Sequence, residues 1–96
     1  MSNALVSIQI IPSLKDNKLT YDYVDAAIAV IEDAGIKYKV SPLETTMEGE
    51  LSTLLAVVEQ MNKKMIDMGA LNVISQVKIF YKPDGIALET LTEKYQ

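Results

Sequence analysis

Polar side chains that could bind a small molecule gather in one short stretch, residues 41–50. It reads Ser-Pro-Leu-Glu-Thr-Thr-Met-Glu-Gly-Glu, so two threonine hydroxyls stand among the carboxylates of Glu44, Glu48 and Glu50. Hydroxyls and carboxylates accept hydrogen bonds, and an ionised carboxylate also attracts cations. Two kinds of chemistry follow: a polar pocket for a neutral or cationic ligand, or a metal or paired-carboxylate site.

These acidic residues have a simpler explanation than a metal site or a catalytic site. Glu48 and Glu50 share one face of the strand that this stretch predicts. Lys37 and Lys39 are expected directly across from that strand, so ordinary cross-strand ion pairing explains the acids. A magnesium or calcium site would draw carboxylates from several loops. We therefore expect no metal, no cofactor and no catalytic residue.

Composition removes most enzyme classes. The 96 residues include no histidine, cysteine, tryptophan or arginine. Without histidine and cysteine, the chain lacks the usual general base near neutral pH, thiolate catalysis and sulfur-ligated zinc. Without arginine, it lacks the forked donor that binds phosphate groups in a bidentate manner. The expectation is a binding protein rather than an enzyme.

Charge and hydropathy narrow the partners and the location. A formal net charge of −4 argues against nucleic acid, which is bound largely through basic surface. No apolar run approaches the roughly 20 residues of a membrane helix, and the start has no basic signal-peptide region. We expect one cytoplasmic domain, residues 1–96, without nucleic-acid or membrane partners.

Hydrophobic periodicity predicts the elements that position the polar stretch. Alternation indicates strands at 5–11, 36–40, 45–50 and 73–81, and helical steps indicate helices at 20–34 and 51–68. Thr20 is expected as the first N-cap, and Gly35 and Gly69 as helix ends. Leu88, Leu91 and Tyr95 predict a short C-terminal helix. The order is that of an α+β, ferredoxin-like β-α-β-β-α-β sandwich with an antiparallel sheet of order 4-1-3-2.

The same patterns predict which side chains face the core. In the strands, these are Val6, Ile8, Ile10, Tyr38, Val40, Val73, Val77, Ile79 and Tyr81. In the helices, they are Tyr21, Val24, Ala27, Ile28, Ile31, Leu51, Leu54, Leu55, Val58, Met61, Met65 and Met68. The helix-free face of the sheet then carries Ile11, Ile74 and Phe80. Apolar groups on an uncovered face suggest self-association to a dimer or tetramer.

Connectivity is expected to gather three loops at one end of the sheet. They follow Pro12, surround residues 42–45 and precede the last strand at Asn72. Thr46 and Glu48 would lie just inside on the helix-free face, because Thr45 and Thr46 point to opposite faces. A ligand cleft is expected where these loops meet.

Four segments of the sequence are similar to those of a known protein family. They are Val6-Ser7-Ile8-Gln9-Ile10-Ile11-Pro12, Gly35-Ile36-Lys37-Tyr38, Thr45-Thr46-Met47-Glu48-Gly49-Glu50 and Val77-Lys78-Ile79. With these segments, the whole chain resembles the small thiamine-binding proteins related to YkoF. The resemblance implies a ferredoxin-like fold, non-catalytic binding of thiamine or its hydroxymethylpyrimidine half, and assembly as dimers or dimers of dimers. Carried over, Thr45, Thr46 and Glu48 become the polar contacts.

The loops and the adjoining face complete the predicted ligand-binding set, which is Gln9, Ile11, Ser13, Ser41, Glu44, Thr45, Thr46, Glu48 and Asn72. The absence of arginine favours free thiamine over its diphosphate. Two other functions remain open on the residues alone. One is a regulatory or structural oligomerising module without a small-molecule ligand, and the other is an enzyme with a carboxylate as its base.

Overall fold

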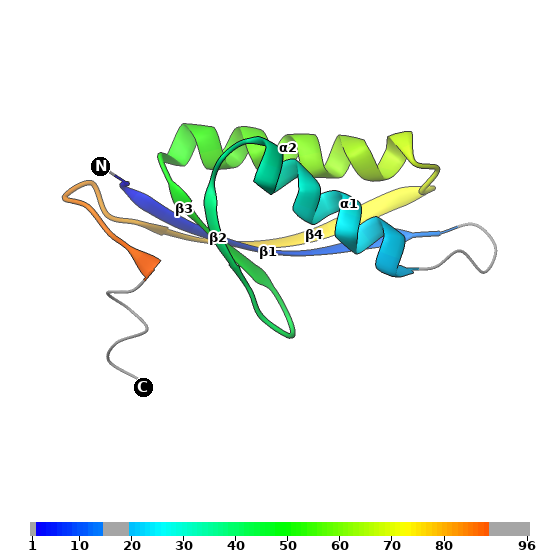
Figure 1. The fold of residues 1–96 in the computed structure, drawn as a ribbon, viewed down its shortest axis with the longest axis horizontal. Helices are drawn as coiled ribbons and strands as arrows, with labels where there is room; N and C mark the ends of the chain where they lie inside the picture. The colour runs from blue at the N-terminus through cyan, green and yellow to red at the C-terminus, as the bar shows by residue number, and fades with distance from the viewer. Residues whose placement is uncertain (1, 15–19, 89–96) are drawn as a thin grey trace.

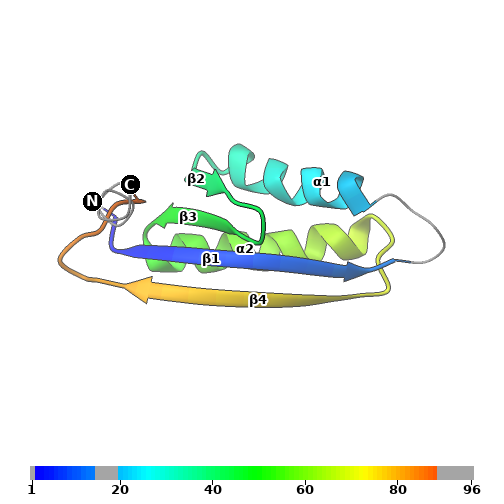
Figure 2. The same ribbon diagram turned by 90° about the horizontal axis from the view of Figure 1, so that it is seen from below.

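The computed structural model of this protein describes residues 2–14 and 20–88. Its elements are β1 (Ala4–Ser13), α1 (Thr20–Asp33), β2 (Lys37–Val40), β3 (Thr45–Gly49), α2 (Leu51–Asp67) and β4 (Asn72–Tyr81). The strands form one antiparallel sheet in the order β2-β3-β1-β4 (Figure 2). Both helices lie on one side of it (Figure 1). The predicted α+β ferredoxin-like fold and strand order are confirmed.

Two predicted boundaries change, and one predicted helix cannot be followed within the described residues. β1 does not end at Pro12 but continues to Ser13, and Pro12 pairs with Val73 of β4. Beyond Ile8, β1 has a paired neighbour only on the β4 side, and proline is tolerated on such an edge. α1 already includes Thr20, which was predicted as the residue just before the helix, and residues 15–19 lie outside the described part of the chain. The expected C-terminal helix rested on Leu88, Leu91 and Tyr95, and residues 89–96 also lie outside the described part.

The core lies between the sheet and the helices. The residues of β1 that face it are the alternate ones that the sequence predicts. Its largest fully buried side chains are Val6, Ile31, Met47, Leu54, Met61 and Met65. The burial of Val6 and Ile8 and the partial burial of Ile10 confirm the predicted inward face. The helix-free side, which we call the open face, carries the alternate residues of each strand.

Two buried helix residues were not predicted. Tyr23 is buried in α1, and its hydroxyl donates to the Met68 carbonyl at the end of α2, 2.8 Å away. That bond satisfies the hydroxyl and allows the ring into the core. Val57 is buried in α2, whereas the predicted Leu55 is exposed, as is Val24 in α1. The core stripe of each helix is therefore rotated slightly from the expected one.

The edge strands are less covered than predicted. Register places Val40 of β2 and Val77, Ile79 and Tyr81 of β4 on the helix side, as expected. All four are exposed rather than buried. β2 and β4 have a paired neighbour on one side only, so solvent reaches their flanks. The dense core is centred on β1, β3 and α2.

The two ends of the described chain meet beside β3. The backbone N–H groups of Lys82 and Ile86 donate to the carbonyls of Asn3 and Ser2. Asn3 also caps α2, because its Oδ1 accepts from the Leu51 N–H at 2.9 Å. Residues 86–88 then return along the open face (Figure 1). Among the described residues, no helix is long and apolar enough to cross a membrane.

Candidate functional site

Strand pairing separates the loops that were expected to meet. In the β2–β3 hairpin, β3 begins at Thr45, which pairs with Ile8 of β1. Ser13 and Asn72 face each other five residues further along β1. At roughly 3.3 Å per residue, they lie about 17 Å along β1 from the pair of Thr45 and Ile8. Ser13 and Asn72 therefore lie near Ile11 but away from Thr45, Thr46 and Glu48, and strand pairing does not bring them to the start of β3 as expected.

A notch beside β1 takes the place of the expected cleft. β3 has five residues against ten in β1, so the sheet loses a strand where β3 begins. The hairpin loop 41–44 borders this notch and is closed by a bond from the Ser41 N–H to the Glu44 carbonyl, 2.8 Å long. Gln9, Leu43 and Glu44 line two separate clefts, one on each side of the loop. The notch is the best-formed candidate site in the described residues.

The first cleft, the helix-side cleft, has a volume of about 210 Å³. Its wall is apolar and comes from three elements, with Ile8 and Ile10 of β1, Val24 and Ile28 of α1, and Met61 of α2. Its rim is polar, with Gln9, Ser41, Glu44 and Thr45. An apolar wall with a few polar groups is the usual composition of a small-molecule site. Four predicted ligand residues therefore come together here.

The second cleft, the open-face cleft, has a volume of about 650 Å³, within the range of roughly 300–1,000 Å³ that is common for ligand sites. It is lined by Gln9, Leu43, Glu44, Gln76, Val77 and Lys78. Ile11 and its partner Ile74 occupy the next position along the open face and are exposed. A polar floor beside an apolar surface can hold a charged heteroaromatic ring.

One ion pair crosses the open-face cleft. Glu44 Oε2 lies 3.3 Å from Lys78 Nζ, so the hairpin loop is joined to β4 across β1. The pKa of Glu44 is lowered, first by the nearby Ser7 hydroxyl and then by the Lys78 ammonium. The carboxylate therefore stays ionised near neutral pH and can attract a cation. Lys78 is 78% exposed and Glu44 33%, so the pair itself is weak.

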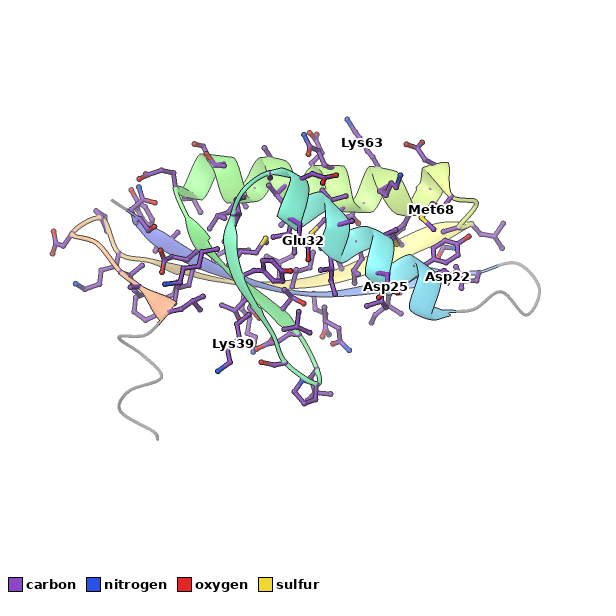
Figure 3. The ribbon with its side chains drawn as sticks, viewed as in Figure 1. Asp22, Asp25, Glu32, Lys39, Lys63 and Met68 are labelled. Carbon is purple, nitrogen blue, oxygen red and sulfur yellow. The ribbon has the colours of Figure 1, made fainter. Side chains whose placement is uncertain are left out.

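Thr46 and Glu48 lie on the open face, as predicted, while Thr45 faces the helix side. Thr46 is opposite Ser7 on one side and Lys39 on the other, and Figure 3 shows Lys39 on the side of the hairpin away from α2. Thr46 thus stands next to the open-face cleft. Neither Thr46 nor Glu48 lines either of the two clefts.

Glu48 has structural partners. Its Oε2 accepts from the Ser2 hydroxyl and its Oε1 from the Leu88 N–H, both at 3.0 Å. Lys37 is 4.0 Å from Oε1, which confirms the predicted cross-strand pairing. The Glu48 side chain is only 15% exposed. The carboxylate holds the chain ends together and has little capacity left for a ligand.

Sequence reasoning missed Leu43, Gln76 and Lys78 as cleft residues. Gln76 and Lys78 lie on the open face, and their closeness to the hairpin depends on the register of β1 with two different strands. That register could not be derived from the strand patterns alone. Within residues 2–14 and 20–88, no three acidic side chains cluster closely enough to hold a metal ion.

Comparison with known proteins gives consistent matches. The family described as "Thiamine-binding protein" matches residues 6–96. The UPF0045 protein CPE1503 of Clostridium perfringens is 44% identical over 96 residues, which is the whole of both chains.

Solved structures agree with this match. A domain of unknown function, DUF77, from Bacillus cereus superimposes with a TM-score of 0.90 and 38% identity over 100% of this chain and 93% of the other. A Thermotoga maritima protein, named as a candidate for thiamine biosynthesis or salvage, has a TM-score of 0.85 and 33% identity over 98% and 99%.

Proposed function

The chain belongs to the thiamine-binding protein family, and on this premise we propose that it binds thiamine or its hydroxymethylpyrimidine half without catalysing a reaction. The family match over residues 6–96 is the observation that carries the proposal. The notch adds a physical basis, because it combines an apolar wall, hydroxyls, an amide and an ionised carboxylate.

The two clefts differ in the ring that each would accept. The helix-side cleft of about 210 Å³ is small for a drug-sized ligand and suits a single ring. An aminopyrimidine presents donors and acceptors on one edge, and Ser41 and Thr45 offer matching groups on the cleft rim. We place the pyrimidine of the ligand there.

The charged half of thiamine would then extend toward the open-face cleft. Its thiazolium carries a permanent positive charge, and Glu44 lines both clefts with an ionised carboxylate. An opposite charge within a partly enclosed site favours such a ligand. The diphosphate is a poorer ligand, because the chain contains no arginine.

Isothermal titration calorimetry with thiamine, hydroxymethylpyrimidine and thiamine diphosphate tests this proposal. Thr45→Val and Glu44→Gln should each weaken thiamine binding by roughly tenfold, because a buried polar partner lost from a ligand contact costs about 1–3 kcal/mol. Thr53→Val, at an exposed position of α2, is the matched control and should leave affinity unchanged. If none of the three compounds binds the unsubstituted chain, the proposed ligand class is wrong.

We further propose that a second copy of the chain covers part of the open face. The support is apolar exposure, since Ile74 is 63% and Phe80 47% exposed on that face. The copy would also roof the open-face cleft, so binding and assembly would be linked. An oligomerising module without a small-molecule ligand is the alternative function.

Light scattering on the unsubstituted chain and on Phe80→Glu separates these alternatives. A dimer or tetramer that Phe80→Glu dissociates is the expected result. A monomer at micromolar concentration would contradict the assembly proposal. An oligomer that binds none of the three compounds would favour the module without a ligand.

A further inference from the structure

Ser7 holds a polar atom that the fold leaves without a partner. Its Oγ is buried and has no partner at full hydrogen-bond geometry within the described residues; the hydroxyl approaches the Glu44 carboxylate closely enough to lower its pKa, but it does not complete a hydrogen bond there. It is the one buried side-chain polar atom among the described residues in this condition. Buried hydroxyls are normally paired, so an unpaired one indicates a missing partner.

Ser7 lies beside the open-face cleft, beneath two of its lining residues, although it does not itself line either cleft. Ser7 pairs with Thr46 of β3 on one side and with Lys78 of β4 on the other, so all three point to the open face. β3 and β4 are two strand spacings apart, about 10 Å. Because Glu44 precedes β3 and still contacts Lys78, their ion pair passes over β1 in the region of Ser7.

We propose that Ser7 is a further ligand-binding residue, which forms with Glu44 a paired hydroxyl and carboxylate for an organic cation, and that Lys78 occupies the carboxylate until the ligand displaces it. This inference rests on the proposed function and extends it to the open-face cleft. The Ser7 hydroxyl can donate or accept, and the ionised carboxylate accepts, so a heteroaromatic cation that carries a hydroxyl group, as the thiazolium half of thiamine does, satisfies both. Displacement is inexpensive, because exposed ion pairs contribute little to stability.

Because the Lys78 ammonium competes with the ligand for the Glu44 carboxylate, substitutions of Ser7 and Lys78 should have opposite effects on affinity. Ser7→Ala removes a ligand contact and should weaken thiamine binding about tenfold. Lys78→Gln removes the competing ammonium and should tighten thiamine binding about two- to fivefold at low salt. The gain should fade at high salt, because screening already weakens the pair there. Uncharged hydroxymethylpyrimidine should bind Lys78→Gln with unchanged affinity.

Calorimetry with thiamine measures the affinities of Ser7→Ala and Lys78→Gln, and Ser75→Ala and Lys64→Gln are their controls. Ser75 already donates to Asn62 on the helix side at 2.8 Å, so its loss should lower the melting temperature but not the affinity. Ser7→Ala should lower the affinity while changing the melting temperature less than Ser75→Ala does, because the Ser7 hydroxyl has no partner at full hydrogen-bond geometry.

Three outcomes are separable. If the unsubstituted chain binds thiamine and Ser7→Ala binds it equally well, the Ser7 assignment is wrong while the proposed function stands. If Lys78→Gln binds thiamine more weakly, the displacement step is wrong. If the unsubstituted chain binds neither thiamine nor hydroxymethylpyrimidine, both the proposed function and this inference fail.

Discussion

Replacing Glu48 with alanine should destabilise the fold, because this carboxylate joins both ends of the described chain to β3. It accepts from the Ser2 hydroxyl and the Leu88 N–H at 3.0 Å each, and it is 15% exposed. Hydrogen bonds to a charged group contribute about 1.5–3 kcal/mol. The Ser2 hydroxyl can turn to water, whereas the part-buried Leu88 N–H would lose its acceptor. We therefore expect a loss of about 2 kcal/mol in the free energy of unfolding.

Thermal and urea unfolding followed by circular dichroism measure this loss. For a domain of this size, 1 kcal/mol corresponds to a shift of about 4–8 °C, so the melting temperature should fall by about 8–16 °C. Glu59→Ala is the control, because Glu59 is 69% exposed and pairs only weakly with Lys63 at 3.9 Å. It should cost less than about 0.5 kcal/mol. Equal stabilities for Glu48→Ala and Glu59→Ala would refute the structural role of Glu48.

Three further predictions concern the core and two titrating groups. Leu54→Ala should cost about 2–5 kcal/mol in urea unfolding, whereas Leu55→Ala, at a 42% exposed position, should cost less than about 1 kcal/mol, and equal costs would contradict the packing of α2. The hydrogen bond to Glu32 raises the pKa of Tyr38 above its usual 10.0, so its stabilising effect is present below pH 10 and is lost as pH rises through the folded value. Ultraviolet titration should show a late phenol ionisation that Tyr38→Phe removes. The pKa of Glu44 is lowered from 4.5, so its effect is present above that pH and fades as pH falls through the folded value, which carboxyl NMR titration measures.

The sequence was sufficient for the fold because its alternation was regular. Val6, Ile8 and Ile10 recur at every second residue, and the structure places them on the helix side of the sheet. Sheet order then followed from the element order and the handedness of the crossovers. Tyr23 was missed because its polar end is satisfied only by a carbonyl at the end of another helix.

The site was harder to predict, because it depends on strand lengths. β3 begins level with Ile8, while β1 runs on to Ser13, and this mismatch creates the notch and places Asn72 away from it. Pro12 was taken as a strand end, although on an unpaired edge it costs little. Glu48 has the residue type and position of a ligand contact, and only the path of residues 86–88 shows its structural partners.

Amide chemical shifts during a thiamine titration test the central claim most directly. Saturable shifts are expected for Gln9, Glu44 and Gln76, which line the clefts beside the hairpin. Figure 3 shows Lys63 on the outer side of α2, and its amide should not move. Shifts confined to α1 and α2, or no saturable shift at millimolar thiamine, would contradict the placement of a cationic ligand in the notch.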